Sequence, residues 1–201
     1  MYGKGTRRAL FSGALESGQL PQKLDLADLH EGMDKLWQQS IAHLENGVVL
    51  EYAATIVLTA EDTLKFINEV RGDSSEVTPD LNVSARETFV GTFHTHPRVD
   101  GLVPMPFSPS DFVSAVLLRE NISVMRSEET VLALVRTQRT VASIDAEEAQ
   151  REFYEVFQSE VFLSGRILDA VWKANLALCE RYGFALYVGR SDEPLKEVYR
   201  P

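Results

Sequence analysis

Apolar residues recur at helical spacing in the first quarter of the chain. Between residues 24 and 45 they fall three or four positions apart, at Leu26, Leu29, Met33, Leu36, Trp37, Ile41 and Leu44. This spacing places them on one face of an α-helix, because a helix turns once every 3.6 residues. The pattern therefore predicts an amphipathic helix over 24–45.

The middle of the chain and its end favour β-strands. Runs rich in β-branched and aromatic residues cover 48–58, 63–70, 88–96, 122–125, 130–137 and 184–188. A turn at 60–62 joins the first two runs, and the spacing of the fourth and fifth is that of a hairpin. Residues 72–82 form a polar loop in this interpretation.

Two further segments have helical patterns. Residues 109–120 carry one apolar face, and 145–182 is mainly helical, with a break near Ser164 and Gly165 and a C-cap glycine at Gly183. The order of the elements predicts one α/β (α+β) domain over 24–201, a mixed β-sheet flanked by helices. Residues 1–23 show no periodicity and are expected to form a flexible or loosely docked N-terminal arm.

The composition is typical of a globular domain. Of the 201 residues, 44% are hydrophobic and 25% are charged. No stretch approaches the ~20 apolar residues of a membrane span, and the N-terminus lacks the apolar core of a secretory signal. The single cysteine, Cys179, excludes an internal disulfide and a cysteine-based zinc site. We therefore expect a cytoplasmic protein without a membrane partner.

The charge balance indicates which partners suit the chain. Twenty basic residues against 30 acidic residues give a net charge of −10. Affinity for nucleic acid depends on Lys and Arg that neutralise phosphates, so we expect no nucleic-acid partner. A basic protein partner fits better, because opposite charges accelerate diffusional encounter. The sequence leaves the oligomeric state open.

Two histidines stand at the end of a predicted strand. His94 and His96 are separated by one residue, so their side chains leave the strand on the same face. Pro97 ends the strand, and Asp111 follows in the predicted first turn of a helix. Two imidazoles and one carboxylate, with a fourth position left to water, form the ligand set of a catalytic zinc site.

Residues 108–111 also have the sequence of a helix start. Serine stands at the N-cap, proline at the first helical position and an acid at the third. This interpretation is compatible with the metal site, because a capped first turn would hold the carboxylate rigidly beside the strand end.

The motif resembles that of a known family. An acid, then His-x-His-Pro at 94–97, then Ser-x-x-Asp at 108–111 is similar to the pattern of the JAMM (JAB1/MPN+) zinc metalloproteases. In the family pattern the acid is a Glu followed three residues later by a small residue, which Glu51 and Ala54 match. Glu45, at the end of the first predicted helix, is the alternative.

The resemblance implies a mechanism and a substrate. Zinc would be held by His94, His96 and Asp111, with Glu51 as general base and the Ser108 hydroxyl stabilising the developing oxyanion. It further implies an MPN-like fold and hydrolysis of the peptide or isopeptide bond after the C-terminal tail of ubiquitin or a ubiquitin-like protein. Because no additional domain is visible, the chain is most similar to the prokaryotic, deubiquitinase-like members.

Two other functions remain open at this point. One is a non-catalytic MPN-type scaffold, and the other is a zinc hydrolase acting on a sulfur-carrier protein or another small peptide conjugate. The loop between the two halves of the motif also departs from the family, because residues 97–107 form a longer, Pro- and Gly-punctuated segment. The family's way of holding substrate is therefore not carried over to this chain.

Overall fold

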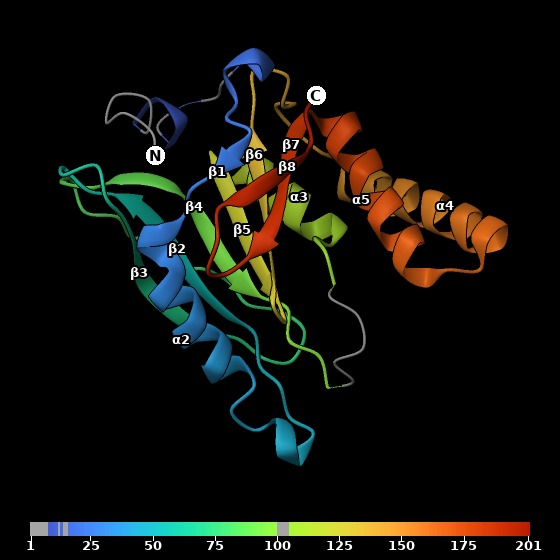
Figure 1. The fold of residues 1–201 in the computed structure, drawn as a ribbon, viewed down its shortest axis with the longest axis horizontal. Helices are drawn as coiled ribbons and strands as arrows, with labels where there is room; N and C mark the ends of the chain where they lie inside the picture. Colours follow the sequence, from blue (N-terminus) through green and yellow to red (C-terminus); the bar gives the residue numbers. More distant parts are fainter. Residues whose placement is uncertain (1–7, 12, 14–15, 100–104) are drawn as a thin grey trace.

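A mixed β-sheet forms the centre of the computed structural model, which describes residues 8–11, 13, 16–99 and 105–201 (Figure 1). Across the sheet the strand order is β1-β8-β7-β6-β5-β4-β2-β3. The strands are β1 (Lys23–Leu24), β2 (Tyr52–Leu58), β3 (Leu64–Arg71), β4 (Thr88–Thr95), β5 (Ile122–Ser127), β6 (Thr130–Arg136), β7 (Phe184–Arg190) and β8 (Leu195–Tyr199). Only β4 and β5 pair in parallel among these strands.

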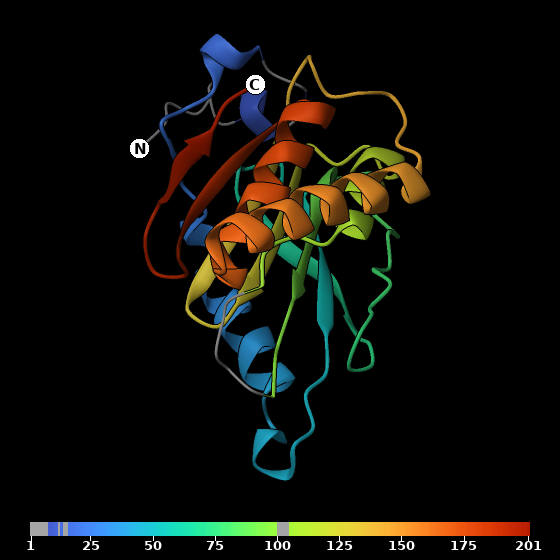
Figure 2. The same cartoon turned by 90° about the vertical axis from the view of Figure 1, so that its right-hand side faces the viewer.

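Helices cover both faces of the sheet. The 3-10 turns and helices are η1 (Ser17–Gln19), η2 (Ala27–Leu29), α2 (His30–Ser40), η3 (Leu44–Asn46), α3 (Pro109–Leu117), α4 (Ala146–Ser164) and α5 (Ile167–Tyr182). Figures 1 and 2 show α2 on one face, and α4 and α5 lying against each other on the opposite side. The predicted α/β class, a mixed sheet flanked by helices, is confirmed.

The alternation of side chains along the strands divides the core into two layers. In β6, Val131, Ala133 and Val135 pack in the cluster under α2, whereas Leu132 and Leu134 pack in the cluster under α3 and α5. This is the period of two expected for a strand that is buried on both faces. Within the described residues, none of the helices has the length and apolar character of a membrane span.

The first predicted helix is shorter in the structure than its apolar pattern suggests. Leu24 is fully buried in β1, where it pairs with Leu195 of β8, and α2 ends at Ser40. The hydroxyl of Ser40 lies 2.6 Å from Thr95 Oγ1 of the sheet. The prediction of one helix over 24–45 was therefore wrong at both ends, because contacts with the sheet override the local pattern.

Part of the segment assigned to an N-terminal arm contributes to the core. Leu10, Phe11 and Leu20 are at most 5% exposed and belong to the same hydrophobic cluster as the buried side chains of α2. The expectation for residues 1–7, 12 and 14–15 lies outside the described residues.

One glycine allows the parallel pair to form. At Gly91 of β4 an added Cβ would lie 1.7 Å from the carbonyl oxygen of Ile122 in β5. Any side chain there would push the two strands apart. The chain leaves β4, forms α3 and then returns as β5, parallel to β4. The carboxyl end of β4 and the start of α3 therefore lie together beside the paired strands β4 and β5.

Candidate metal centre

The end of β4 presents two imidazole rings on the α3 side of the sheet. Phe93, the residue before His94, points to the opposite face of the sheet and is fully buried in the α2-side core. His96 lies just past the strand, and its amide donates to the carbonyl of Arg126 at 2.8 Å, which continues the pairing with β5. The alternation thus carries His94 and His96 to one face, as the sequence predicted.

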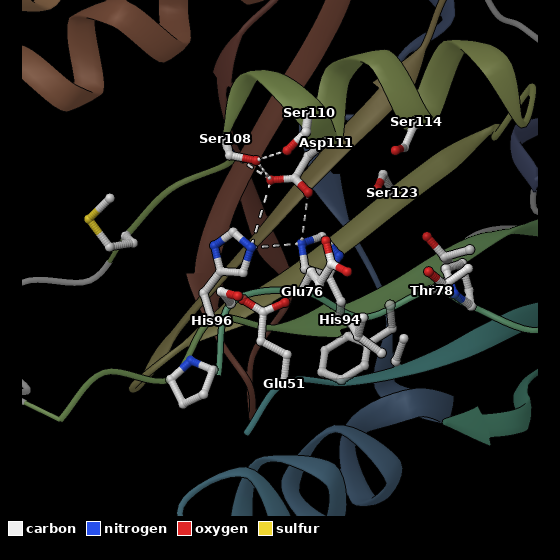
Figure 3. A pocket seen from close by; sticks show the side chains of 18 of the residues that line it. Glu51, Glu76, Thr78, His94, His96, Ser108, Ser110, Asp111, Ser114 and Ser123 are labelled. Carbon is white, nitrogen blue, oxygen red and sulfur yellow. Dashed lines mark hydrogen bonds and ion pairs between the residues drawn. The ribbon is translucent and has the colours of Figure 1, made fainter. Parts of the chain in front are cut away.

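The start of α3 brings the carboxylate to the same place. Ser108 has extended backbone angles at the N-cap, and Pro109 is the first helical residue. The amide of Ser108 donates to Asp111 Oδ2 at 2.6 Å, and the Ser108 hydroxyl donates to the same oxygen at 2.7 Å. The predicted capping turn is therefore present, and it holds Asp111 toward the two histidines (Figure 3).

The three side chains meet at distances that suit one metal ion. Nε2 of His94 and Nε2 of His96 are 3.0 Å apart, and these nitrogens lie 3.3 Å and 3.7 Å from the two carboxylate oxygens of Asp111. In a tetrahedral zinc site with bonds of about 2.0–2.1 Å, neighbouring ligand atoms are ~3.3 Å apart. His94, His96 and Asp111 therefore form a group that could hold a metal ion.

The electrostatics of the group favour a bound cation. Burial lowers the pKa of His96 to about 4, so this ring is neutral, the form that binds metals. Burial also acts to lower the pKa of His94, but the charge and hydrogen bond of Asp111 outweigh it and the net shift is upward. For Asp111, burial raises the pKa, but His94, His96 and the Ser108 hydroxyl together hold it well below its usual range. A metal ion would replace the proton shared by this pair.

A fourth candidate, Glu51, lies directly before β2. Its amide donates to the carbonyl of Asp73 at 2.7 Å, and its carbonyl accepts from the amide of Gly72 at 2.8 Å, so the backbone is fixed on both sides. Figure 3 shows its carboxylate turned toward the two imidazoles. Burial raises the pKa of Glu51 to about 7; the charge of His94 opposes this shift and that of Asp111 adds to it.

The two candidates for the general base, Glu51 and Glu45, lie in different places. Glu51 lines a pocket of about 490 Å³ together with His94, His96, Ser108 and Asp111. Glu45 is exposed on η3 and is not among the residues that line this pocket. The five residues singled out in the sequence thus face one space.

Hydrogen bonds from β5 and α5 fix both ends of the loop between His96 and Ser108. The hydroxyl of Ser127 donates to the carbonyl of His96 at 3.0 Å and accepts from the amide of Met105 at 3.1 Å. Asn175, fully buried in α5, donates to the carbonyl of Phe107 at 3.0 Å. Both ends of the long 97–107 loop are therefore tied down, while residues 100–104 lie outside the described part.

The pocket contains residues that the sequence did not indicate. Its outer wall includes Glu76 and other residues of 75–79, and its inner end contains Thr92, Glu120 and Ser123. Thr92 could have been found, because it stands two residues before His94 and must share its face. Nothing in the local sequence places Glu120 or the polar loop beside the metal centre.

The chain matches no family model, no curated protein and no solved structure.

Proposed function

We propose that this protein is a zinc-dependent hydrolase of amide or isopeptide bonds, of the kind that the JAMM resemblance implies. The observation that carries the proposal is a half-buried carboxyl group, Glu51, which lines one pocket together with three side chains that could hold a metal ion. Structural zinc sites are closed by four protein ligands, whereas catalytic sites keep a position open for water. Among the described residues the ligand group has three members and lines a pocket, which fits the second kind.

The ligand set suits zinc. His94 in β4 and His96 directly after it supply imidazole nitrogens, and Asp111 in the first turn of α3 supplies a carboxylate oxygen. When bound, such an ion would lower the pKa of a coordinated water toward about 7 and polarise a substrate carbonyl group.

Glu51 would move the proton. A carboxyl group with a pKa near neutrality can accept a proton from the attacking water and return it to the leaving nitrogen. No side chain would become covalently attached to the substrate in this reaction.

Ser108 would stabilise the oxyanion that develops on the attacked carbonyl. Its hydroxyl now donates to Asp111 and lies 2.7 Å from the hydroxyl of Ser110. Rotation about one bond would direct it into the pocket. The loss of a single donor of this kind costs about 10²–10³ in rate.

The substrate we propose is the bond after the C-terminal tail of ubiquitin or a ubiquitin-like protein. Charge supports this choice, because the chain carries a net charge of −10 and the tails of many such proteins contain arginine. Among the described residues, four carboxyl groups line the pocket itself, those of Glu51, Glu76, Asp111 and Glu120. Hydrolysis of a sulfur-carrier or other small peptide conjugate would use the same centre.

Metal content is the first test. Protein purified without added metal should contain about one zinc ion per chain, and Asp111→Ala should lose it. Asp145→Ala is a matched control, because Asp145 caps α4 by accepting from the amide of Glu148 at 2.8 Å but lies outside the pocket. This control should keep its zinc although both variants lose a helix cap, worth ~1 kcal/mol.

The zinc-loaded protein should then be assayed on ubiquitin-like tails joined by peptide and isopeptide bonds, and on a sulfur-carrier conjugate. Cleavage that is absent in Asp111→Ala and present in Asp145→Ala would support the proposed hydrolase. A wild type that takes up no zinc after reconstitution would contradict it and favour a non-catalytic scaffold.

A further inference from the structure

The pocket extends beyond the metal centre along β4. His96, His94 and Thr92 alternate along the strand and line its floor. Ser110, Ser114 and Leu118 stand four residues apart on the α3 side and line one wall. A substrate held at the metal centre can therefore reach past His94 toward Thr92, about 7 Å further along the strand.

A buried carboxyl group closes this inner end. After α3, Arg119 adopts a left-handed backbone conformation, φ 53°, and the amide of Glu120 donates back to the carbonyl of Ala115 at 3.0 Å. This turn directs Glu120 inward, where the residue is only 2% exposed. Thr92 Oγ1 donates to its Oε1 at 2.8 Å.

The second oxygen of this carboxyl group, Oε2, has no hydrogen-bond partner. The nearby Arg136 does not serve it, because its guanidinium donates to backbone carbonyls, those of Glu120 and Ala115, at 2.9 Å and 3.0 Å. A buried polar atom without a partner is rare and costly in a folded protein. Because Glu120 is among the residues that line the pocket, a group that enters its inner end would lie beside this carboxyl group.

We propose that Glu120, with the hydroxyl groups of Ser114 and Ser123, forms a subsite that binds a primary ammonium group of the substrate. Ser123 is 4% exposed and lines the pocket beside Glu120, and Figure 3 shows Ser114 and Ser123 beyond Asp111 on the same side. An ammonium group has three donors, which one carboxylate oxygen and two hydroxyls satisfy. A guanidinium fits less well, because it pairs best with both oxygens of a carboxylate and Oε1 is already occupied.

This subsite would select substrates by position. Because a chain spans about 3.3–3.6 Å per residue, the ammonium group would lie roughly two residues from the bond that is cut. A lysine side chain or a free amino terminus near that bond has the required chemistry. This last step rests on the proposed hydrolase function, whereas binding of the ammonium group does not.

The test measures binding and needs no catalysis. Nα-acetyl-lysine methylamide and its uncharged analogue Nα-acetyl-norleucine methylamide would be titrated into wild type, Glu120→Gln and Ser114→Leu, with binding followed by NMR. Wild type should bind the lysine probe at least about tenfold more tightly, the effect of one charge-assisted hydrogen bond. Glu120→Gln should lose this preference, and Ser114→Leu, which fills the entrance from the exposed side of α3, should weaken binding of the lysine probe.

Glu147→Gln makes the same charge change on the exposed first turn of α4 and should retain the preference. Equal binding of the two probes by wild type would overturn the proposal, because water alone would then satisfy Glu120. A preference that survives in Glu120→Gln would overturn it as well. A preference for the lysine probe in a protein that holds no zinc would support the subsite and contradict only the proposed hydrolase.

Discussion

Asp111 serves the helix and the candidate metal centre at the same time, and its Oδ2, which caps the helix, also lies 3.7 Å from Nε2 of His96. Oδ2 accepts two hydrogen bonds from Ser108 and fixes the first turn of α3. Oδ1 lies 3.3 Å from Nε2 of His94. The capping interaction therefore orients the ligand, in the way that outer hydrogen bonds orient metal-binding carboxylates in general.

Glu51→Gln separates metal binding from proton transfer. Gln keeps the shape of the side chain but cannot accept and return a proton, so zinc content should be unchanged. Activity on a substrate that wild type cleaves should fall by about 10²–10⁴, the usual contribution of general acid–base catalysis. Steady-state rates and metal analysis of the same preparation check both parts.

Glu45→Gln is the matched control for this prediction, because Glu45 is exposed on η3, outside the pocket. It should leave both zinc content and rate unchanged. Full activity in Glu51→Gln together with loss in Glu45→Gln would transfer the role of base to Glu45.

At the scale of elements, the candidate centre depends on the parallel contact between β4 and β5. Gly91→Ala should disrupt it, because the new Cβ would lie 1.7 Å from the carbonyl oxygen of Ile122 and one strand must move. We expect a loss of at least about 3 kcal/mol in the free energy of unfolding, the upper range for overpacking, measured by denaturant unfolding. Zinc affinity should fall too, since His94 lies on β4 and His96 directly follows it.

Gly18→Ala provides the comparison, because an added Cβ at Gly18 meets nothing within 4 Å. Its unfolding free energy should stay within about 0.5 kcal/mol of wild type. A Gly91→Ala protein as stable as Gly18→Ala would show that the two strands can separate without cost.

Local patterns predict those parts of the fold and site that local geometry determines. Alternation along a strand placed His94 and His96 on one face, and the capping sequence of 108–111 gave the start of α3. Both features extend over a few residues, so they can be seen without the rest of the chain.

The remaining features depend on residues distant in sequence. Leu24 lies in a strand because Leu195 pairs with it, and β8 itself was not predicted. Glu120 turns inward only because Arg119 takes a left-handed conformation after α3, and because Thr92 of the sheet binds its carboxyl group. Short sequence patterns do not show contacts of this kind, so the residues at the inner end of the pocket could be identified only from the structure.

At the scale of the whole molecule, burying Glu120 makes stability depend on pH. Burial raises the pKa of Glu120 to about 7 from its ordinary 4.5, with the Thr92 hydrogen bond and the polar Ser123 hydroxyl opposing the shift. The folded state therefore binds this proton more tightly than the unfolded state. The contribution of Glu120 to stability is fully present below pH 4.5, falls as the pH rises, and is lost above about pH 7.

Glu120→Gln should remove this dependence, because its amide stays neutral. In the presence of a chelator, the variant's gain in unfolding free energy over wild type should be larger at pH 8 than at pH 5 by roughly 2–3 kcal/mol. Denaturant unfolding at the two pH values measures the difference. Glu147→Gln, at an exposed position, should change stability by the same small amount at both. A Glu120→Gln gain that does not grow with pH would mean that the carboxylate is ionised in the folded protein at little cost, because something other than the described side chains already compensates its buried oxygen.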